Sequence, residues 1–115
     1  MNTKLFSSII TLLFLSALAF GGKETKEASF KAFGNCGMCQ KRIEKSLKIK
    51  EVSSATWDKK TKMLTVKYDA SAITLDSLHQ RVALAGHDTE KFKATDEVYN
   101  ELPGCCLYRE NNHEH

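Results

Sequence analysis

The order of short patterned segments between residues 28 and 94 constrains the fold of this chain more than any other feature. Strand patterns, in which aromatic or β-branched residues alternate with polar ones, occupy residues 28–33, 52–58 and 62–68, with a weaker one at 87–94. Helical patterns occupy residues 39–50 and 75–85. Thr74 is the expected N-cap of the second helix, and Gly86 its stop.

This β-α-β-β-α-β order is that of the split βαβ arrangement. The sequence therefore predicts an α+β, ferredoxin-like sandwich with two helices on one face of a four-stranded antiparallel sheet. A short helical C-terminal extension is expected over residues 95–102, before Pro103 and Gly104. The predicted core consists of Ile43, Leu47, Val52, Leu64, Val66, Leu75, Leu78 and Val82.

The first residues do not fit this domain. A basic start at Lys4 precedes the apolar run 5–20, and Ala17-Leu18-Ala19 has the small-x-small form of a cleavage site. The run predicts a signal peptide over residues 1–19, and hence a periplasmic or secreted protein with no stable membrane insertion after processing. The alternative is a retained anchor, but the run is shorter than the ~20 residues of a spanning helix. Residues 20–27 form a polar linker, 28–94 the domain and 95–115 the extension.

Composition excludes some classes of function. The formal net charge of +3 is close to neutral, which does not suggest a nucleic-acid binder. No Ser-His-Asp set, carboxylate pair or phosphate-binding loop is visible, which argues against an enzyme. The chain has four cysteines, and export would place them where disulfides persist.

The stretch "NCGMCQ" carries the chemistry. Cys36 and Cys39 stand three positions apart between the first predicted strand and the first predicted helix. The unpaired N–H groups and dipole of a helix start favour thiolates, and Lys41 and Arg42 favour them further. Two thiolates suit a soft, low-coordinate ion such as Cu(I), whereas a structural Zn(II) site wants four ligands.

A C-x-x-C at this position, with the βαββαβ order, resembles the heavy-metal-associated domain. That family includes small copper chaperones, modules of copper-transporting ATPases and the periplasmic mercury-binding protein. The resemblance runs from Ser29 to Ala94 and includes "VSSATWDKKTKMLTVKYD" and "SLHQRVALAGHD". It implies that Cys36 and Cys39 bind a metal ion, with Cu(I) first and Hg(II) or Zn(II) behind. It also implies a metal-transporting membrane protein or another metal carrier as partner.

The chain departs from the family pattern at two places. The Met that usually precedes the first cysteine is absent from "FGNC", and either the loop is one residue shorter or Gly34 fills that position. Met38 lies between the cysteines instead. His87 stands where bacterial members often have Tyr after Ala-Gly.

Two other functions remain open for the cysteine pair. A thiol-disulfide oxidoreductase also places C-x-x-C at a helix start, but this chain lacks the Gly-Pro between the cysteines, and its only proline, Pro103, comes late. A disulfide-stapled module that binds a protein partner is the other alternative.

Several further residues are candidates for additional metal ligands. Cys105 and Cys106 either fold over the first pair, bind their own ion, bridge back to Cys36 or Cys39, or are simply buried. We expect the fold-back, because the extension keeps apolar residues after the sheet is complete: Val98, Leu102, Leu107 and Tyr108. His87 is a candidate third ligand or an exposed loop residue.

For the remaining histidines and the charged residues of the first helix, a structural or solvent-exposed role is the first expectation. His79 is expected to be a solvated helix residue, and the tail residues His113 and His115 weak ligands for Cu(II) or Zn(II), or no ligands at all. The first helix is basic. Its cations form either a solvated face or a docking face for an acidic partner: Lys41, Arg42, Lys45, Lys48 and Lys50.

Overall fold

A three-stranded antiparallel sheet forms one layer of the protein, whose computed structural model describes residues 23–110. The strands are β1 (Thr25–Lys31), β2 (Val52–Trp57) and β3 (Met63–Asp69), in the spatial order β1-β3-β2. Strand β1 begins three residues before the expected Ala28, inside the segment expected to be linker. The expected signal peptide and the two tail histidines lie outside the described residues.

Strand pairing follows the period of the sequence. Phe30 of β1 and Trp57 of β2 both stand opposite Leu64 of the central strand, so one face of the sheet is apolar. The β2–β3 turn is closed by the Asp58 carboxylate, which accepts hydrogen bonds from the backbone N–H groups of Lys60 at 2.7 Å and Thr61 at 3.1 Å. The predicted hairpin is therefore confirmed.

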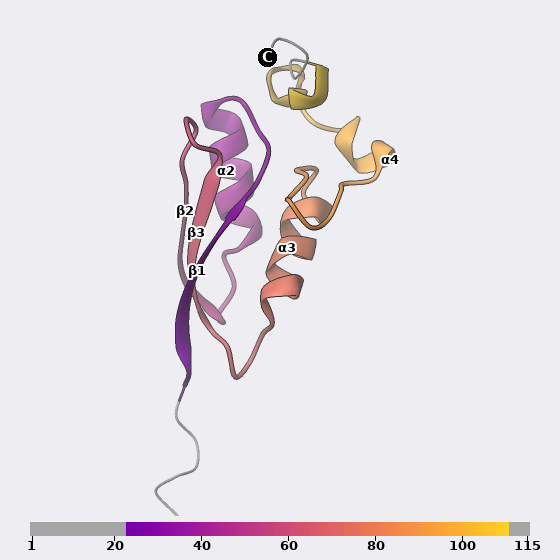
Figure 1. Cartoon of the computed structure of the whole chain (residues 1–115). Coiled ribbons are helices and arrows are strands. Elements are labelled where there is room, and N and C mark those ends of the chain that lie inside the picture. The colour runs from indigo at the N-terminus through magenta and orange to yellow at the C-terminus, as the bar shows by residue number, and fades with distance from the viewer. Residues whose placement is uncertain (1–22, 111–115) are drawn as a thin grey trace, which may run out of the picture.

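Two helices, α2 (Gly37–Ser46) and α3 (Leu75–Leu84), lie over the same face of the sheet (Figure 1). Helix α2 begins two residues before the expected Cys39 and ends at Ser46. The Thr74 hydroxyl caps α3 as predicted, accepting a hydrogen bond from Ser77 N at 3.1 Å. The α+β class and the two-helix layer agree with the prediction. Among residues 23–110, no helix has both the length and the apolar character that crossing a membrane requires.

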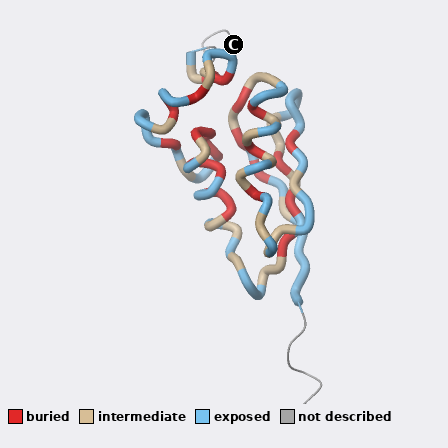
Figure 2. Tube along the Cα trace, turned by 180° about the vertical axis from the view of Figure 1, so that it is seen from behind, coloured by how far each residue is buried: buried red, intermediate tan, exposed pale blue. Residues whose placement is uncertain are grey.

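The core fills the space between helices and sheet, where the buried residues of both layers face each other (Figure 2). Six of the eight predicted core residues are buried: Ile43, Leu47, Leu64, Val66, Leu78 and Val82. Val52 and Leu75 are only half-buried at its edge. The core also takes in aromatic side chains from all three strands: Phe30, Trp57 and Tyr68.

The fourth strand expected over residues 87–94 is reduced to one bridge, Ala32 with Thr89. The chain turns at this point because the Thr89 hydroxyl accepts hydrogen bonds from the N–H groups of Lys91 at 3.1 Å and Phe92 at 3.0 Å. Backbone groups that would continue the ladder are thus used locally. The sheet has three full strands rather than four.

The expectation that His79 is solvated is wrong. Its side chain is 2% exposed and stacks on the Phe30 ring, with ring centroids 3.8 Å apart. Its Nδ1 atom lies 2.7 Å from the Thr89 hydroxyl. Burial lowers the pKa of His79, so the ring is a neutral part of the core.

The C-terminal extension packs back on the domain, as its apolar residues predicted. It contains α4 (Asp96–Tyr99), capped by the Thr95 hydroxyl, and the 3-10 helix η1 (Gly104–Cys106). Leu102 and Tyr108 are buried, and Val98 and Leu107 are half-buried. Helix η1 lies beside the start of α2 (Figure 1).

Leu47, the C-cap residue of α2, is buried and provides a test of this core. Leu47→Ala should lower the free energy of unfolding by about 2–5 kcal/mol, because it removes buried methyl groups and leaves a cavity. Leu84→Ala is the matched control, since Leu84 is 74% exposed. Urea unfolding of the metal-free, reduced protein measures both. Equal costs at the two positions would contradict the described packing.

Candidate metal centre

The first cysteine pair lies where the chain passes from β1 into α2. Cys36 occupies the N-cap position of α2 with an extended backbone, and Cys39 lies in the first turn. The Cys36 side chain is partly exposed, whereas Cys39 is 0% exposed. The two Sγ atoms are 3.3 Å apart. All four cysteines of the chain are free thiols in this structure.

A third sulfur joins this pair from the C-terminal extension. Cys106 Sγ lies 3.6 Å from Cys36 Sγ, and the sulfur atoms of Cys36, Cys39 and Cys106 all lie within 4.8 Å of one another. Cys106 is 0% exposed. Among the described residues, these three cysteines are the cluster of potential ligands whose spacing would fit one metal ion.

The indole of Trp57 supports the cysteine loop from below. Its Nε1 donates a hydrogen bond to the carbonyl oxygen of Ala32 at 2.9 Å, and its ring packs against Gly34. A Cβ atom at Gly34 would lie 2.9 Å from Cys39 Cβ and 3.2 Å from the Trp57 ring. Gly34 is therefore required by space, and the indole lies close beneath the loop that lacks the family methionine.

The pKa values of the clustered thiols are shifted in different directions by their surroundings. Burial alone raises the pKa of Cys36, but hydrogen bonds from Cys39, Cys106 and Cys105 outweigh it and lower that pKa to about 7. Burial raises the pKa of Cys39 and of Cys106. The Cys39 thiol donates a hydrogen bond to Asn35 Oδ1 at 3.2 Å. Of Cys36, Cys39 and Cys106, Cys36 is thus the thiol that most readily becomes a thiolate.

A polar latch holds the C-terminal extension to the domain. The Tyr108 hydroxyl donates to the carbonyl oxygen of Gly86 at 2.9 Å and accepts from Asp88 N at 2.7 Å. Arg109 donates to both carboxylate oxygens of Asp88, at 2.8 and 3.2 Å, and to Ala94 O at 2.7 Å. Sequence analysis did not identify this latch, because no local pattern connects an arginine with an acid 21 residues earlier.

His87, a candidate third ligand, lies behind the loop. It is 0% exposed, and its Nδ1 is 2.7 Å from the carbonyl oxygen of Phe33. Its ring stacks on Tyr108, with centroids 5.3 Å apart. Burial lowers the pKa of His87, and Nε2 has no hydrogen-bond partner among the described residues. His87 is not part of the three-sulfur cluster.

Cys105, the neighbour of Cys106, faces solvent. Its Sγ is 3.9 Å from Cys106 Sγ but does not belong to the compact cluster. Cys105 and Cys36 line the same surface pocket, together with Met38 and Lys41. A reactant that enters this pocket meets two accessible thiols.

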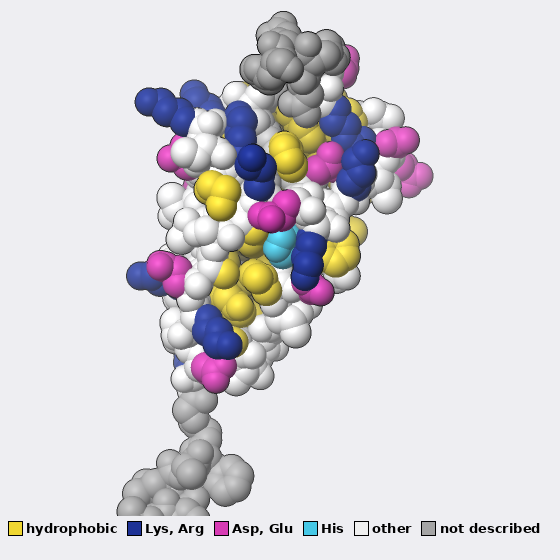
Figure 3. All heavy atoms as spheres, in the orientation of Figure 1, with side chains coloured by type: hydrophobic (Ala, Val, Ile, Leu, Met, Phe, Trp, Pro, Cys, Tyr) yellow, Lys and Arg dark blue, Asp and Glu magenta, His cyan; other side chains and the backbone are white. Residues whose placement is uncertain are grey.

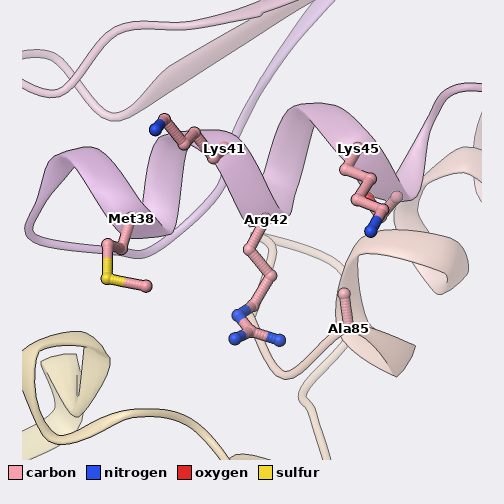
Figure 4. A pocket seen from close by; sticks show the side chains of 6 residues that line it. Met38, Lys41, Arg42, Lys45 and Ala85 are labelled. Atoms are coloured by element: carbon pink, nitrogen blue, oxygen red, sulfur yellow. The ribbon is translucent and has the colours of Figure 1, made fainter.

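Basic side chains flank the site on α2. Lys41, Arg42 and Lys45 line a second pocket with Met38 and Ala85, and Figure 4 shows Met38 and Arg42 projecting from the same side of α2. In the view of Figure 3, Lys and Arg side chains are concentrated toward the end of the molecule where α2 begins. Lys41 also lines the pocket of Cys36 and Cys105, so a cation lies beside the approach to these thiols.

A cluster of cysteine sulfurs at the first helix of a small α+β sandwich defines a thiolate metal-binding module. The family model "Heavy-metal-associated domain" matches residues 31–88, half of the chain. The chain belongs to the heavy-metal-associated domain family. No curated protein matches the sequence significantly.

Solved structures show the same fold. The N-terminal domain of a potential copper-translocating P-type ATPase from Bacillus subtilis, in the Cu(I)-loaded state, is 31% identical, with 57% of this chain and 85% of that one covered and a TM-score of 0.54. The CopZ metallochaperone is 24% identical, with 56% and 98% covered and a TM-score of 0.53. Oxidized MerP from Ralstonia metallidurans CH34 is 22% identical, with 58% and 96% covered and a TM-score of 0.55. The last two show the fold alone; family and cysteine cluster together support metal binding or transfer.

The latch predicts a pH dependence of stability. Burial raises the pKa of Asp88, but hydrogen bonds from Arg109 outweigh it and leave that pKa below its ordinary value. A depressed folded-state pKa stabilises the protein above the unfolded value of about 3.9, and this contribution is lost as the pH falls through the folded pKa. Asp88→Asn should therefore destabilise the protein at pH 7, and the difference from wild type should shrink below pH ~4.

Asp96→Asn is the matched control for this experiment. Asp96 contacts the same guanidinium at 3.0 Å, but its side chain is 94% exposed, so its loss should change the free energy of unfolding by less than about 1 kcal/mol. Urea unfolding of both variants between pH 7 and pH 3 provides the comparison. A constant difference between Asp88→Asn and wild type across this range would contradict the ion pair.

Proposed function

We propose that the protein binds one Cu(I) ion through Cys36 and Cys39 and carries or sequesters it, rather than acting as an enzyme. The observation that supports this most directly is the placement of two free thiols 3.3 Å apart at the start of α2 in a heavy-metal-associated domain. One thiol is buried and the other reaches the surface. The buried thiol can retain the ion while the accessible one exchanges with an incoming ligand.

The choice of Cu(I) rests on ligand chemistry. Thiolates are soft ligands and select soft ions, and Cu(I) tolerates two or three of them. Zn(II) in a structural site takes four ligands, whereas the described cluster offers three sulfurs. The relative with 31% identity is described in a Cu(I)-loaded state, which supports the same ion here. Hg(II), also soft, is the second candidate.

The proposed partner is a metal-transporting membrane protein or another metal carrier. The domain of the potential copper-translocating ATPase shares this fold and is 31% identical over the aligned region. Lys41, Arg42 and Lys45 lie on the helix that carries the thiols. Such cations would speed encounter with an acidic surface. Transfer would then pass the ion between thiolates of the two proteins without releasing it free.

We also propose that the protein is exported. The support is the apolar run 5–20 after Lys4, followed by a polar segment, which is the form of a cleavable signal peptide. The four free thiols would then meet an oxidising environment, in which a bound soft ion protects the thiols that hold it.

Cu(I) competition tests the proposed ligands. The reduced wild type should bind about one equivalent, and Cys36→Ser or Cys39→Ser should weaken binding more than about a hundredfold, because even outer-shell losses cost 10–100-fold. Competition against a chromophoric Cu(I) chelator under anaerobic conditions measures the affinity. His87→Asn is the control, since it can keep a hydrogen bond to Phe33 O and should change affinity far less. Unchanged affinity in both cysteine variants would contradict the proposal.

Intact mass spectrometry tests export. The chain secreted by a bacterial host should have lost residues 1–19, so its mass should correspond to a start at Phe20. The variant Leu13→Arg places a charge in the apolar run and should leave the chain unprocessed and inside the cell. Recovery of an uncleaved chain in the membrane fraction would indicate the anchor instead.

A further inference from the structure

The third sulfur of the cluster comes from outside the segment that the family model matches. Cys36 lies within residues 31–88, but Cys106 lies 70 residues after Cys36, in the C-terminal extension. Its Sγ is nevertheless 3.6 Å from Cys36 Sγ and fully buried. A thiol at this position, facing the pair rather than solvent, requires an explanation.

The extension holds Cys106 in place from both sides. On one side, Leu102 is buried over Gly86, and Cys106 N donates to the carbonyl oxygen of Pro103 at 2.8 Å. On the other side, the Tyr108 hydroxyl and the Arg109 guanidinium bind the 86–88 loop. The position of the sulfur is therefore fixed by packing and by hydrogen bonds that belong to the extension itself.

The spacing of the sulfurs fits three ligands around one ion. If each sulfur lies about 2.3 Å from the ion, three sulfurs in a trigonal plane are about 4 Å apart. Two sulfurs on opposite sides of the ion, in linear coordination, are about 4.6 Å apart. The observed separations are 3.3 Å for Cys36–Cys39 and 3.6 Å for Cys36–Cys106, with all three sulfurs within 4.8 Å. The two separations from Cys36 are closer to the distance in the trigonal plane than to that of a linear pair.

We propose that Cys106 is the third ligand of the soft-metal site, so that Cys36, Cys39 and Cys106 bind Cu(I) as three thiolates. This inference rests on the proposed function. Binding forms three metal–sulfur bonds and releases the protons of the three thiols to solvent. The exposed Cys105, at the mouth of the pocket, stays outside the set of ligands.

Paired variants separate Cys106 from its neighbour. Because Cys105 could replace Cys106 after a single substitution, Cys105→Ser is compared with the double variant Cys105→Ser/Cys106→Ser. X-ray absorption of the Cu(I)-loaded proteins, prepared with a phosphine reductant and no added thiol, should count three sulfur neighbours in wild type and in Cys105→Ser. The double variant should have two, and its affinity should fall by more than about tenfold.

The outcomes distinguish this inference from the proposed function. If wild type and Cys105→Ser bind Cu(I) with two sulfurs, and the double variant binds equally well, Cys106 is not a ligand although the proposed function stands. If wild type does not bind Cu(I), both proposals fail. The coordination number of wild type decides the question without mutation, and thermal melting of the metal-free double variant shows whether it is folded.

Discussion

The burial of Trp57 under the cysteine loop is the contact on which the rest of this structure depends. The indole closes the core at the end of β2, donates to the last residue before the loop, and leaves no room for a side chain at Gly34. The backbone N–H of Trp57 also donates a hydrogen bond to the Glu44 carboxylate of α2 at 2.9 Å. One residue thereby joins the sheet, the loop and the helix. The packed indole supports the loop, in which Cys39 is buried and Cys36 is partly exposed.

A second set of contacts closes the site from the opposite end of the chain. The latch of Tyr108, Arg109 and Asp88 is polar, yet most of its atoms are buried, so each hydrogen bond is needed to satisfy a group removed from water. Leu102 adds an apolar contact over Gly86, whose φ of +108° and lack of a Cβ admit both the turn and the leucine. The extension is thus a structural part of the domain.

Local features of the sequence predicted much of this architecture. The spacing of apolar residues predicted α2, α3 and the β2–β3 hairpin. The residue type of Thr74 predicted the helix cap, and the apolar residues of the extension predicted its fold-back. Long-range polar contacts could not be predicted in the same way. His79 is a polar residue on an amphipathic helix, and its contacts with Thr89 and Phe30 lie outside that helix. The fourth strand ends early because Thr89 hydrogen-bonds to its own neighbours. Cys106 faces inward and Cys105 outward because of the turn after Pro103, and no spacing of residues in the sequence predicts that turn.

The closeness of Cys36 and Cys106 has a consequence for the unfolded chain. These residues are 70 positions apart, so an ion held by both would close a loop that contains most of the domain. Such a closure lowers the conformational entropy of the unfolded state, as a disulfide across the same span would, and longer loops gain more from it. Unlike a disulfide, this cross-link would form and open with the arrival and departure of the cargo. The stability of the folded chain would then depend on whether the ion is bound.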